Sequence, residues 1–132
     1  MLARREHSAF ELRRKLQQRN FVETDIEQAI EQLGQEGLLS DQRFAEAYIY
    51  MRKNKGYGPL RIALELKERG VAEDDFRPCL YANDLDWSAA LEAAYAKKYG
   101  HRSCDDYQEK ARRTRYLQYR GFAYDEINKL FG

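Results

Sequence analysis

The sequence has little of what builds sheets, disulfide frameworks or membrane spans. Only two prolines and eight glycines interrupt its 132 residues, and two cysteines are too few for a disulfide framework. No apolar run is long enough to cross a bilayer, and residues 1–6 lack the apolar stretch of a secretory signal peptide. These absences predict a cytoplasmic protein that does not span a membrane.

The sequence also lacks the motifs of common catalytic sites. It contains neither the Gly-x-x-x-x-Gly-Lys-Ser/Thr motif of a phosphate-binding loop nor the Gly-x-Gly-x-x-Gly motif of a dinucleotide site. His101 and Cys104 form a lone pair without the second pair of ligands that a zinc site needs. We therefore expect no enzyme, no catalytic residue, no cofactor and no metal site.

What the chain has in abundance is helix-forming residues with helical spacing. Val22, Ile26, Ile30 and Leu33 form one apolar stripe, and Tyr48 lies on another, where we assign it to the core. No segment alternates as a strand does, so an all-α fold is expected. Ser40 is the expected N-cap of the third of about eight helices, which are 1–19, 23–34, 41–55, 59–69, 73–83, 87–99, 103–120 and 123–131.

One of these helices contains a proline. Pro78 would remove an interior hydrogen bond from the helix expected over 73–83. We therefore expect either a kink or a late start in that helix.

The helices repeat along the chain. The pattern Leu-x-x-Arg-(Gly/Asn)-apolar occurs at 16–21, 66–71 and 117–122. In each case a second helix follows a turn that glycine or asparagine closes in the left-handed conformation. Repeats of this kind build an elongated array in which each unit mainly contacts its neighbours. The expected division is a first repeat over 1–56, a second over 57–102 and a final pair of helices over 103–132.

The net charge of +1 hides an alternation that follows the repeat. Residues 1–20, 51–70 and 95–121 carry net charges of +4, +4 and +5. The segments between and after them are acidic, with −4 over 21–33, −2 over 34–50, −5 over 71–94 and −1 over 122–132. Acidic residues at helix starts and basic residues at helix ends complement the helix dipole, which explains part of this pattern.

The density of two basic clusters goes beyond that explanation. Tyrosines lie among the basic residues of both clusters, and cations interleaved with stacking surfaces suit nucleic acid or an acidic protein. The first expected contact patch is Arg52, Lys53, Lys55, Tyr57 and Arg61. The second is Lys110, Arg112, Arg113 and Arg115, with Arg120 nearby in the sequence.

The middle third carries a distinctive series of segments. They are 37–48 (GLLSDQRFAEAY), 52–62 (RKNKGYGPLRI) and 65–71 (ELKERGV). Further matches lie at 5–8, 11–16, 86–87, 97–100 and 119–122. Over nearly the whole chain, this series resembles the RecX family of bacterial regulatory proteins. Asn20 departs mildly from the pattern, since the later repeats have glycine there.

The resemblance implies an elongated, curved array of tandem three-helix repeats that docks into the RecA filament on single-stranded DNA. We expect the chain to act as a monomer. It implies inhibition of the strand exchange, ATP hydrolysis and coprotease activities of RecA. A helix-turn-helix protein that acts on DNA without RecA is the alternative. Against it, the second helix of each pair opens with acidic residues, which DNA phosphates would repel.

Overall fold

The computed structural model describes residues 6–131 and, over that range, contains helices and no strands. In chain order these are α1 (Ala9–Gln18), α2 (Glu23–Gln35), α3 (Asp41–Asn54), α4 (Pro59–Glu68), α5 (Glu73–Leu80), the 3₁₀ turn η1 (Asn83–Leu85), α6 (Trp87–Tyr99), α7 (Tyr107–Tyr119) and α8 (Tyr124–Phe131). None of these helices is both long and apolar enough to cross a membrane. The expected all-α fold is confirmed.

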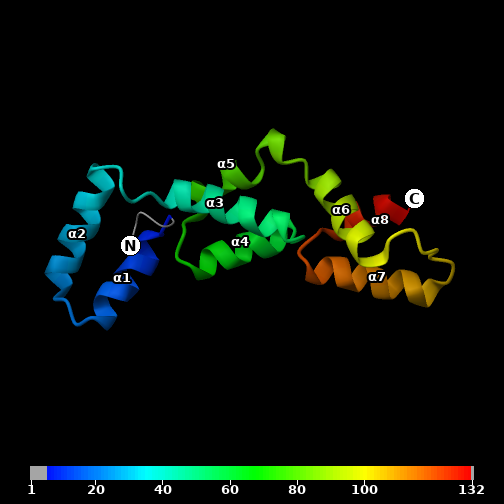
Figure 1. The fold of residues 1–132 in the computed structure, drawn as a ribbon, viewed down its shortest axis with the longest axis horizontal. Coiled ribbons are helices and arrows are strands. Elements are labelled where there is room, and N and C mark those ends of the chain that lie inside the picture. The colour runs from blue at the N-terminus through cyan, green and yellow to red at the C-terminus, as the bar shows by residue number, and fades with distance from the viewer. Residues whose placement is uncertain (1–5, 132) are drawn as a thin grey trace.

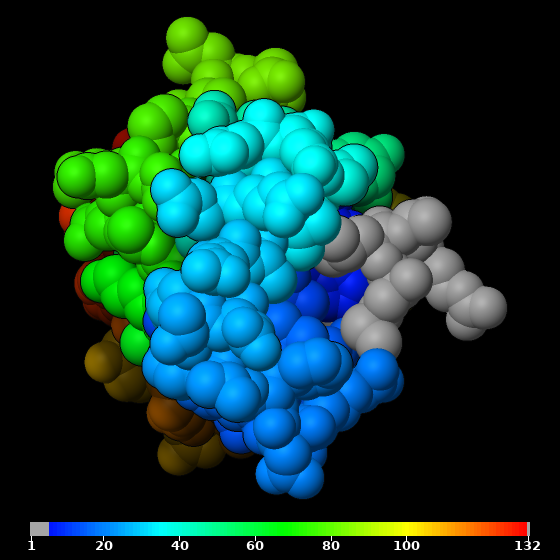
Figure 2. Space-filling model, turned by 90° about the vertical axis from the view of Figure 1, so that its left-hand side faces the viewer, coloured from blue at the N-terminus to red at the C-terminus, as the bar shows by residue number. Residues whose placement is uncertain are grey.

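The helices follow one another along an elongated molecule. One end is formed by α1 and α2, the middle by α3 to α5, and the other end by α6 to α8 (Figure 1). Viewed end on, the surface of α1 and α2 lies in front of the rest of the chain (Figure 2). This succession along one axis is what a tandem repeat predicts.

Side-chain caps set where several helices begin. Ser8 and Glu11 form a capping box at the start of α1, and Asp106 accepts a hydrogen bond from the Glu109 N–H at 2.6 Å at the start of α7. The helices expected over 1–19 and 103–120 therefore begin later, at Ala9 and Tyr107. Residues 1–5 lie outside the described residues. The Ser40 cap is confirmed, since its hydroxyl accepts from the Arg43 N–H at 3.2 Å.

Pro78 lies inside α5, as the sixth of its eight residues. The helix begins at Glu73, so the expected late start is wrong, and it ends at Leu80, before the expected end at 83. Pro78 has no N–H to donate to the carbonyl of Asp74, so α5 lacks one interior hydrogen bond but stays helical as far as Leu80. The chain then continues through η1 to α6.

The repeated turns have the expected left-handed conformation. The φ angles are 65° at Asn20, 77° at Gly70 and 106° at Gly121. In each turn the following apolar residue donates its N–H to the carbonyl of the motif's leucine, as between Phe122 and Leu117 at 3.1 Å. The turns therefore direct α2, α5 and α8 back along α1, α4 and α7.

The buried residues group the helices into units with a different phase from the expected division. One cluster joins α3, α4 and α5, with Phe44, Ile62, Leu66 and Phe76 at its centre. A second joins α6, α7 and α8. The expected boundaries at 56/57 and 102/103 instead fall inside these clusters. A periodic sequence gives the length of a repeat, but only side-chain packing shows which three consecutive helices share a core.

Candidate partner-binding surface

The loop between α3 and α4 is joined to the turn between α7 and α8 by backbone hydrogen bonds. The Gly58 N–H donates to the Arg120 carbonyl at 2.7 Å, and the Leu60 N–H donates to the Gly121 carbonyl at 3.0 Å. N–H groups at a helix start and carbonyls at a helix end have no partner within their own helix. The two ends therefore satisfy each other across the boundary between the middle and C-terminal clusters.

The Arg120 side chain completes this junction. Its Nε donates to the Gly56 carbonyl at 3.1 Å, and Nη2 donates to the Lys55 carbonyl. Its guanidinium carbon also lies 3.9 Å from the centre of the Tyr57 ring, and that of Arg52 lies 3.8 Å from the same ring. Arg120, which is near the second basic cluster in sequence, therefore belongs to the first cluster in space.

Glu65 is the acceptor at the centre of the first cluster. Arg52 donates to both of its carboxylate oxygens at 2.9 and 3.0 Å, Arg61 donates at 3.1 Å and the Tyr48 hydroxyl at 2.8 Å. Burial alone would raise the pKa of Glu65, but hydrogen bonds from these three residues outweigh it and hold the pKa below its ordinary value. Burial, and then the bond to Glu65, raise the pKa of Tyr48 to about 12.

The first expected patch therefore divides into structural and accessible parts. The side chains of Arg52 and Arg61 are only 17% and 28% exposed, and their guanidinium groups are held by Glu65. Tyr57 is half-buried among the arginines. Lys55 is exposed and Lys53 is half-buried, and no ion pair to either is found within the described residues. These two lysines are the cations that this patch leaves available.

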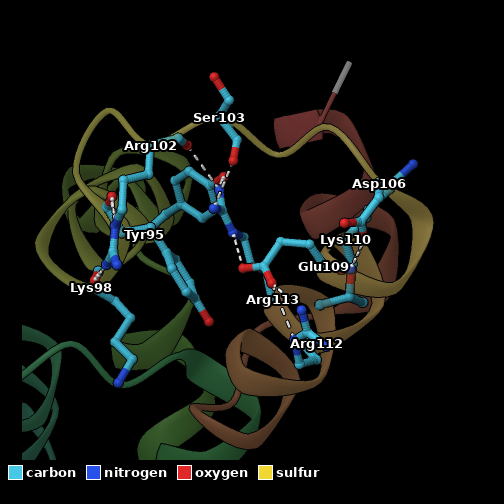
Figure 3. A network of polar contacts seen from close by, with 11 residues as sticks. Tyr95, Lys98, Arg102, Ser103, Asp106, Glu109, Lys110, Arg112 and Arg113 are labelled. Carbon is cyan, nitrogen blue, oxygen red and sulfur yellow. Dashed lines mark hydrogen bonds and ion pairs between the residues drawn. The ribbon is translucent and has the colours of Figure 1, made fainter.

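Arg113, from the second patch, is buried. Its side chain is bound by Glu109 at 3.0 Å, the Tyr95 hydroxyl at 2.6 Å and the carbonyls of Arg102 and Ser103 at 3.1 and 3.0 Å. Figure 3 shows these groups converging on Arg113 from α6, α7 and the loop between them. Only 3% of the residue is exposed. Arg113 therefore holds the fold together and does not present its guanidinium to a partner, which corrects its assignment to the contact surface.

Replacing Arg113 with methionine should loosen the loop between α6 and α7. The loop carbonyls of Arg102 and Ser103 would lose their donor, and a buried acceptor without a donor is costly. We expect amide hydrogen exchange over 101–106 to become about tenfold faster. The control is Arg112→Met, because Arg112 contacts the same Glu109 from an exposed position. Equal exchange in the two variants would contradict the role given to Arg113.

The remaining cations of the second patch are exposed. Arg112 pairs with Glu109, whereas Lys110 and Arg115 have no carboxylate within ion-pair distance in the described part of the chain. Lys110 lies 5.6 Å from the centre of the Phe131 ring. Lys110, Arg112 and Arg115 thus stay available to a partner. Of these, only Arg112 has a carboxylate that competes with the partner.

Two clefts next to the available lysines contain residues that the sequence did not single out. Lys97 lines a cleft of about 290 Å³ with Lys53, over alanines of α6. Tyr124 lines another, of about 260 Å³, with Lys110 and Arg115. Lys97 lies on α6 whereas Lys53 lies on α3, and Tyr124 lies on α8 whereas Lys110 lies on α7. Their spacing in the sequence therefore carried no signal of the contact.

The three units correspond to three family models. The first three-helix domain of RecX matches residues 1–33, the second matches 40–77 and the third matches 84–131. The chain belongs to the RecX family. The second and third RecX domains cover the same helices as the two buried clusters, so packing and family comparison agree on the units.

Individual RecX proteins match nearly the whole chain. Regulatory protein RecX of Pseudomonas entomophila (strain L48) is 43% identical over 130 residues, which are 98% of this chain and 84% of that protein. The RecX protein of Ectopseudomonas mendocina (strain ymp) is 41% identical, over 98% of this chain and 87% of its own. The crystal structure of RecX from Lactobacillus salivarius superposes with a TM-score of 0.77 at 26% identity, over 98% and 86% of the two chains.

Proposed function

We propose that this chain binds the RecA filament on single-stranded DNA and inhibits the recombinase, ATPase and coprotease activities of RecA in DNA repair and the SOS response. The observation that carries the proposal is the match to RecX regulatory proteins over 98% of the chain. In this proposal the chain acts as a monomer in the cytoplasm. The accessible cations Lys53, Lys55, Lys110, Arg112 and Arg115 contact the filament.

The architecture supports a mechanism in which one filament state is favoured over another. The junction at Arg120 and Gly121 joins the middle and C-terminal units, so their basic surfaces are held at a fixed spacing. A ligand whose contacts match the subunit spacing of one filament state binds that state more tightly and shifts the equilibrium toward it. The acidic first turns of α2 and α5 complement basic surfaces of the filament.

The test is RecA-dependent ATP hydrolysis on single-stranded DNA, titrated with the protein. The chain should inhibit hydrolysis, and Lys53→Glu with Lys55→Glu should raise the half-inhibiting concentration about tenfold through repulsion from phosphates or acidic groups. Arg52 and Arg61 are left intact because they hold Glu65. The matched control is Lys67→Glu with Arg77→Glu, which changes the charge equally on exposed residues of α4 and α5.

Two results would contradict the proposal. An absence of inhibition by the unmodified chain, well above stoichiometric amounts, would reject the function. Equal loss of inhibition in the Lys53/Lys55 variant and in the Lys67/Arg77 control would reject the contact surface and leave only a general effect of charge.

A further inference from the structure

The cleft between α7 and α8 combines two open tyrosine rings with two cations that have no carboxylate partner within residues 6–131. Its lining residues are Tyr107, Lys110, Ala111, Thr114, Arg115, Tyr124 and Asn128, around a volume of about 260 Å³. Those from α7 follow the spacing i, i+3, i+4, i+7 and i+8, which is one face of a helix. The lining contains no carboxylate.

Both tyrosine rings of this cleft are open to solvent. Tyr107 is 86% exposed and Tyr124 is 55% exposed. Within the described residues, neither ring lies against another aromatic ring or a cation. Tyr119 is 71% exposed, but its ring already has the Arg61 guanidinium 4.8 Å from its centre. Large exposed aromatic side chains without an internal partner are platforms on which a ligand ring can stack.

The cations of the cleft are separated from the acidic residues around it. On α7, Glu109 is bound by Arg112 and Arg113, which leaves Lys110 and Arg115 without a carboxylate partner in the described range. On α8, Glu126 is 3.4 Å from Lys129. Asp106 is the N-cap of α7, and its carboxylate accepts the Glu109 N–H. Asp105 and Asp125, which lie close in sequence to Tyr107 and Tyr124, are exposed acidic residues outside the lining.

The other clefts offer a poorer site for a ligand that has both negative charges and aromatic rings. The cleft between α4 and α7 has Arg61 and Tyr119, but it also contains Glu65, which holds Arg61, and Glu68. A cleft between α3 and the α5–α6 connection has Tyr50 but also Glu46 and Asp84. The cleft that holds Lys53 and Lys97 is lined with alanines and has no aromatic ring. The α7–α8 cleft alone among these four joins cations with tyrosines and has no lining carboxylate.

We propose that the α7–α8 cleft binds single-stranded nucleic acid directly, with unpaired bases stacked on Tyr107 and Tyr124 and the flanking phosphates on Lys110 and Arg115. In a duplex the faces of the bases are already stacked, so the tyrosines favour a single strand. The inference rests on the proposed function in that it assigns the DNA contact to one surface. The remaining surfaces of the chain are then available to contact RecA itself.

Binding of the chain alone to a labelled oligothymidine, without RecA, tests this assignment by fluorescence anisotropy. Tyr107→Ala and Tyr124→Ala should each weaken binding about tenfold, whereas Tyr107→Phe and Tyr124→Phe should bind like the unmodified chain because a phenyl ring also stacks. Lys110→Gln and Arg115→Gln should each lower the slope of log affinity against log salt by about 0.7. The controls are Tyr50→Ala, an exposed tyrosine in an acidic cleft, and Arg112→Gln, a cation paired with Glu109.

The outcomes of this experiment distinguish the cleft assignment from the proposed function. Unchanged oligothymidine affinity in both alanine variants overturns the proposal, as does an equal loss in Tyr50→Ala. If those variants lose inhibition of RecA but keep oligothymidine affinity, the cleft contacts protein and the proposal is wrong. If the chain fails to inhibit RecA yet shows the expected oligothymidine losses, the cleft assignment stands and the proposed function fails.

Discussion

Replacing Glu65 with glutamine is expected to lower the free energy of unfolding by about 2–3 kcal/mol near neutral pH. The carboxylate accepts hydrogen bonds from Arg52, Arg61 and the Tyr48 hydroxyl, and its side chain is 14% exposed. A glutamine amide has one acceptor oxygen and no charge, so the two guanidinium groups would lose their counter-ion. Denaturant unfolding measures the loss, and Glu68→Gln is the control because Glu68 is exposed on the same helix.

The same variant should have a characteristic pH dependence. The pKa of Glu65 in the folded chain lies below its ordinary value of 4.5, so the folded state binds a proton less readily than the unfolded state does. The ionised carboxylate therefore contributes fully above about pH 4.5, and its contribution disappears as the pH falls through the folded pKa. The difference in unfolding free energy between the unmodified chain and Glu65→Gln should shrink over that acidic range. A difference that stays constant there would show that the contribution is not ionic.

Local patterns in the sequence identified most of the helices and all three repeated turns. Apolar spacing and the Leu-x-x-Arg-(Gly/Asn)-apolar motif depend on residues within one or two helical turns, and these are visible in a sequence. The expected starts of α1 and α7 lie too early because Ser8 and Asp106 are N-caps, and each helix begins only after its cap. Both carried a signal that could have been used, since each has a glutamate three residues later, as a capping box does.

The contact surface was predicted less well because charge density does not show what a cation faces. Arg112, Arg113 and Arg115 are neighbours in sequence, yet only Arg113 is buried. Its position four residues before the buried Leu117 places both on the inner face of α7, which was an available signal. Arg120 could not have been assigned in this way, since its partners, Lys55 and Gly56, lie more than 60 residues away.

The difference between Asn20 and the later glycines also has a structural reason. A Cβ atom on Gly70 would lie 2.3 Å from the Cβ of Phe10, and one on Gly121 would lie 2.4 Å from the Cβ of Arg61. In both cases a helix of another unit packs directly against the turn: α1 against Gly70 and α4 against Gly121. The left-handed conformation alone permits asparagine, but this contact requires glycine. The motif therefore marks which turns join two units of the chain.

Replacing Gly121 with alanine is accordingly expected to destabilise the chain by about 3–5 kcal/mol. At a φ of 106° a side chain is strained, and the added methyl group would meet the backbone nitrogen of Arg61 at 2.7 Å and the Gly58 carbonyl at 2.9 Å. Backbone atoms cannot rotate away as the end of a side chain can. Relief therefore requires the α7–α8 turn to move off α4, which breaks the hydrogen bonds from Gly58 and Leu60.

The control is Gly100→Ala, which separates conformational strain from the loss of the junction. Gly100 also has a positive φ, of 61°, but a Cβ there would have no neighbour within 4 Å. Alanine at this position should cost about 1–3 kcal/mol, from the backbone conformation alone. Gly121→Ala should in addition make the middle and C-terminal units unfold at different denaturant concentrations, because each has its own buried cluster and the junction couples them. Equal destabilisation by the two substitutions, with a single unfolding transition in both, would show that the contact with α4 is not what couples the units.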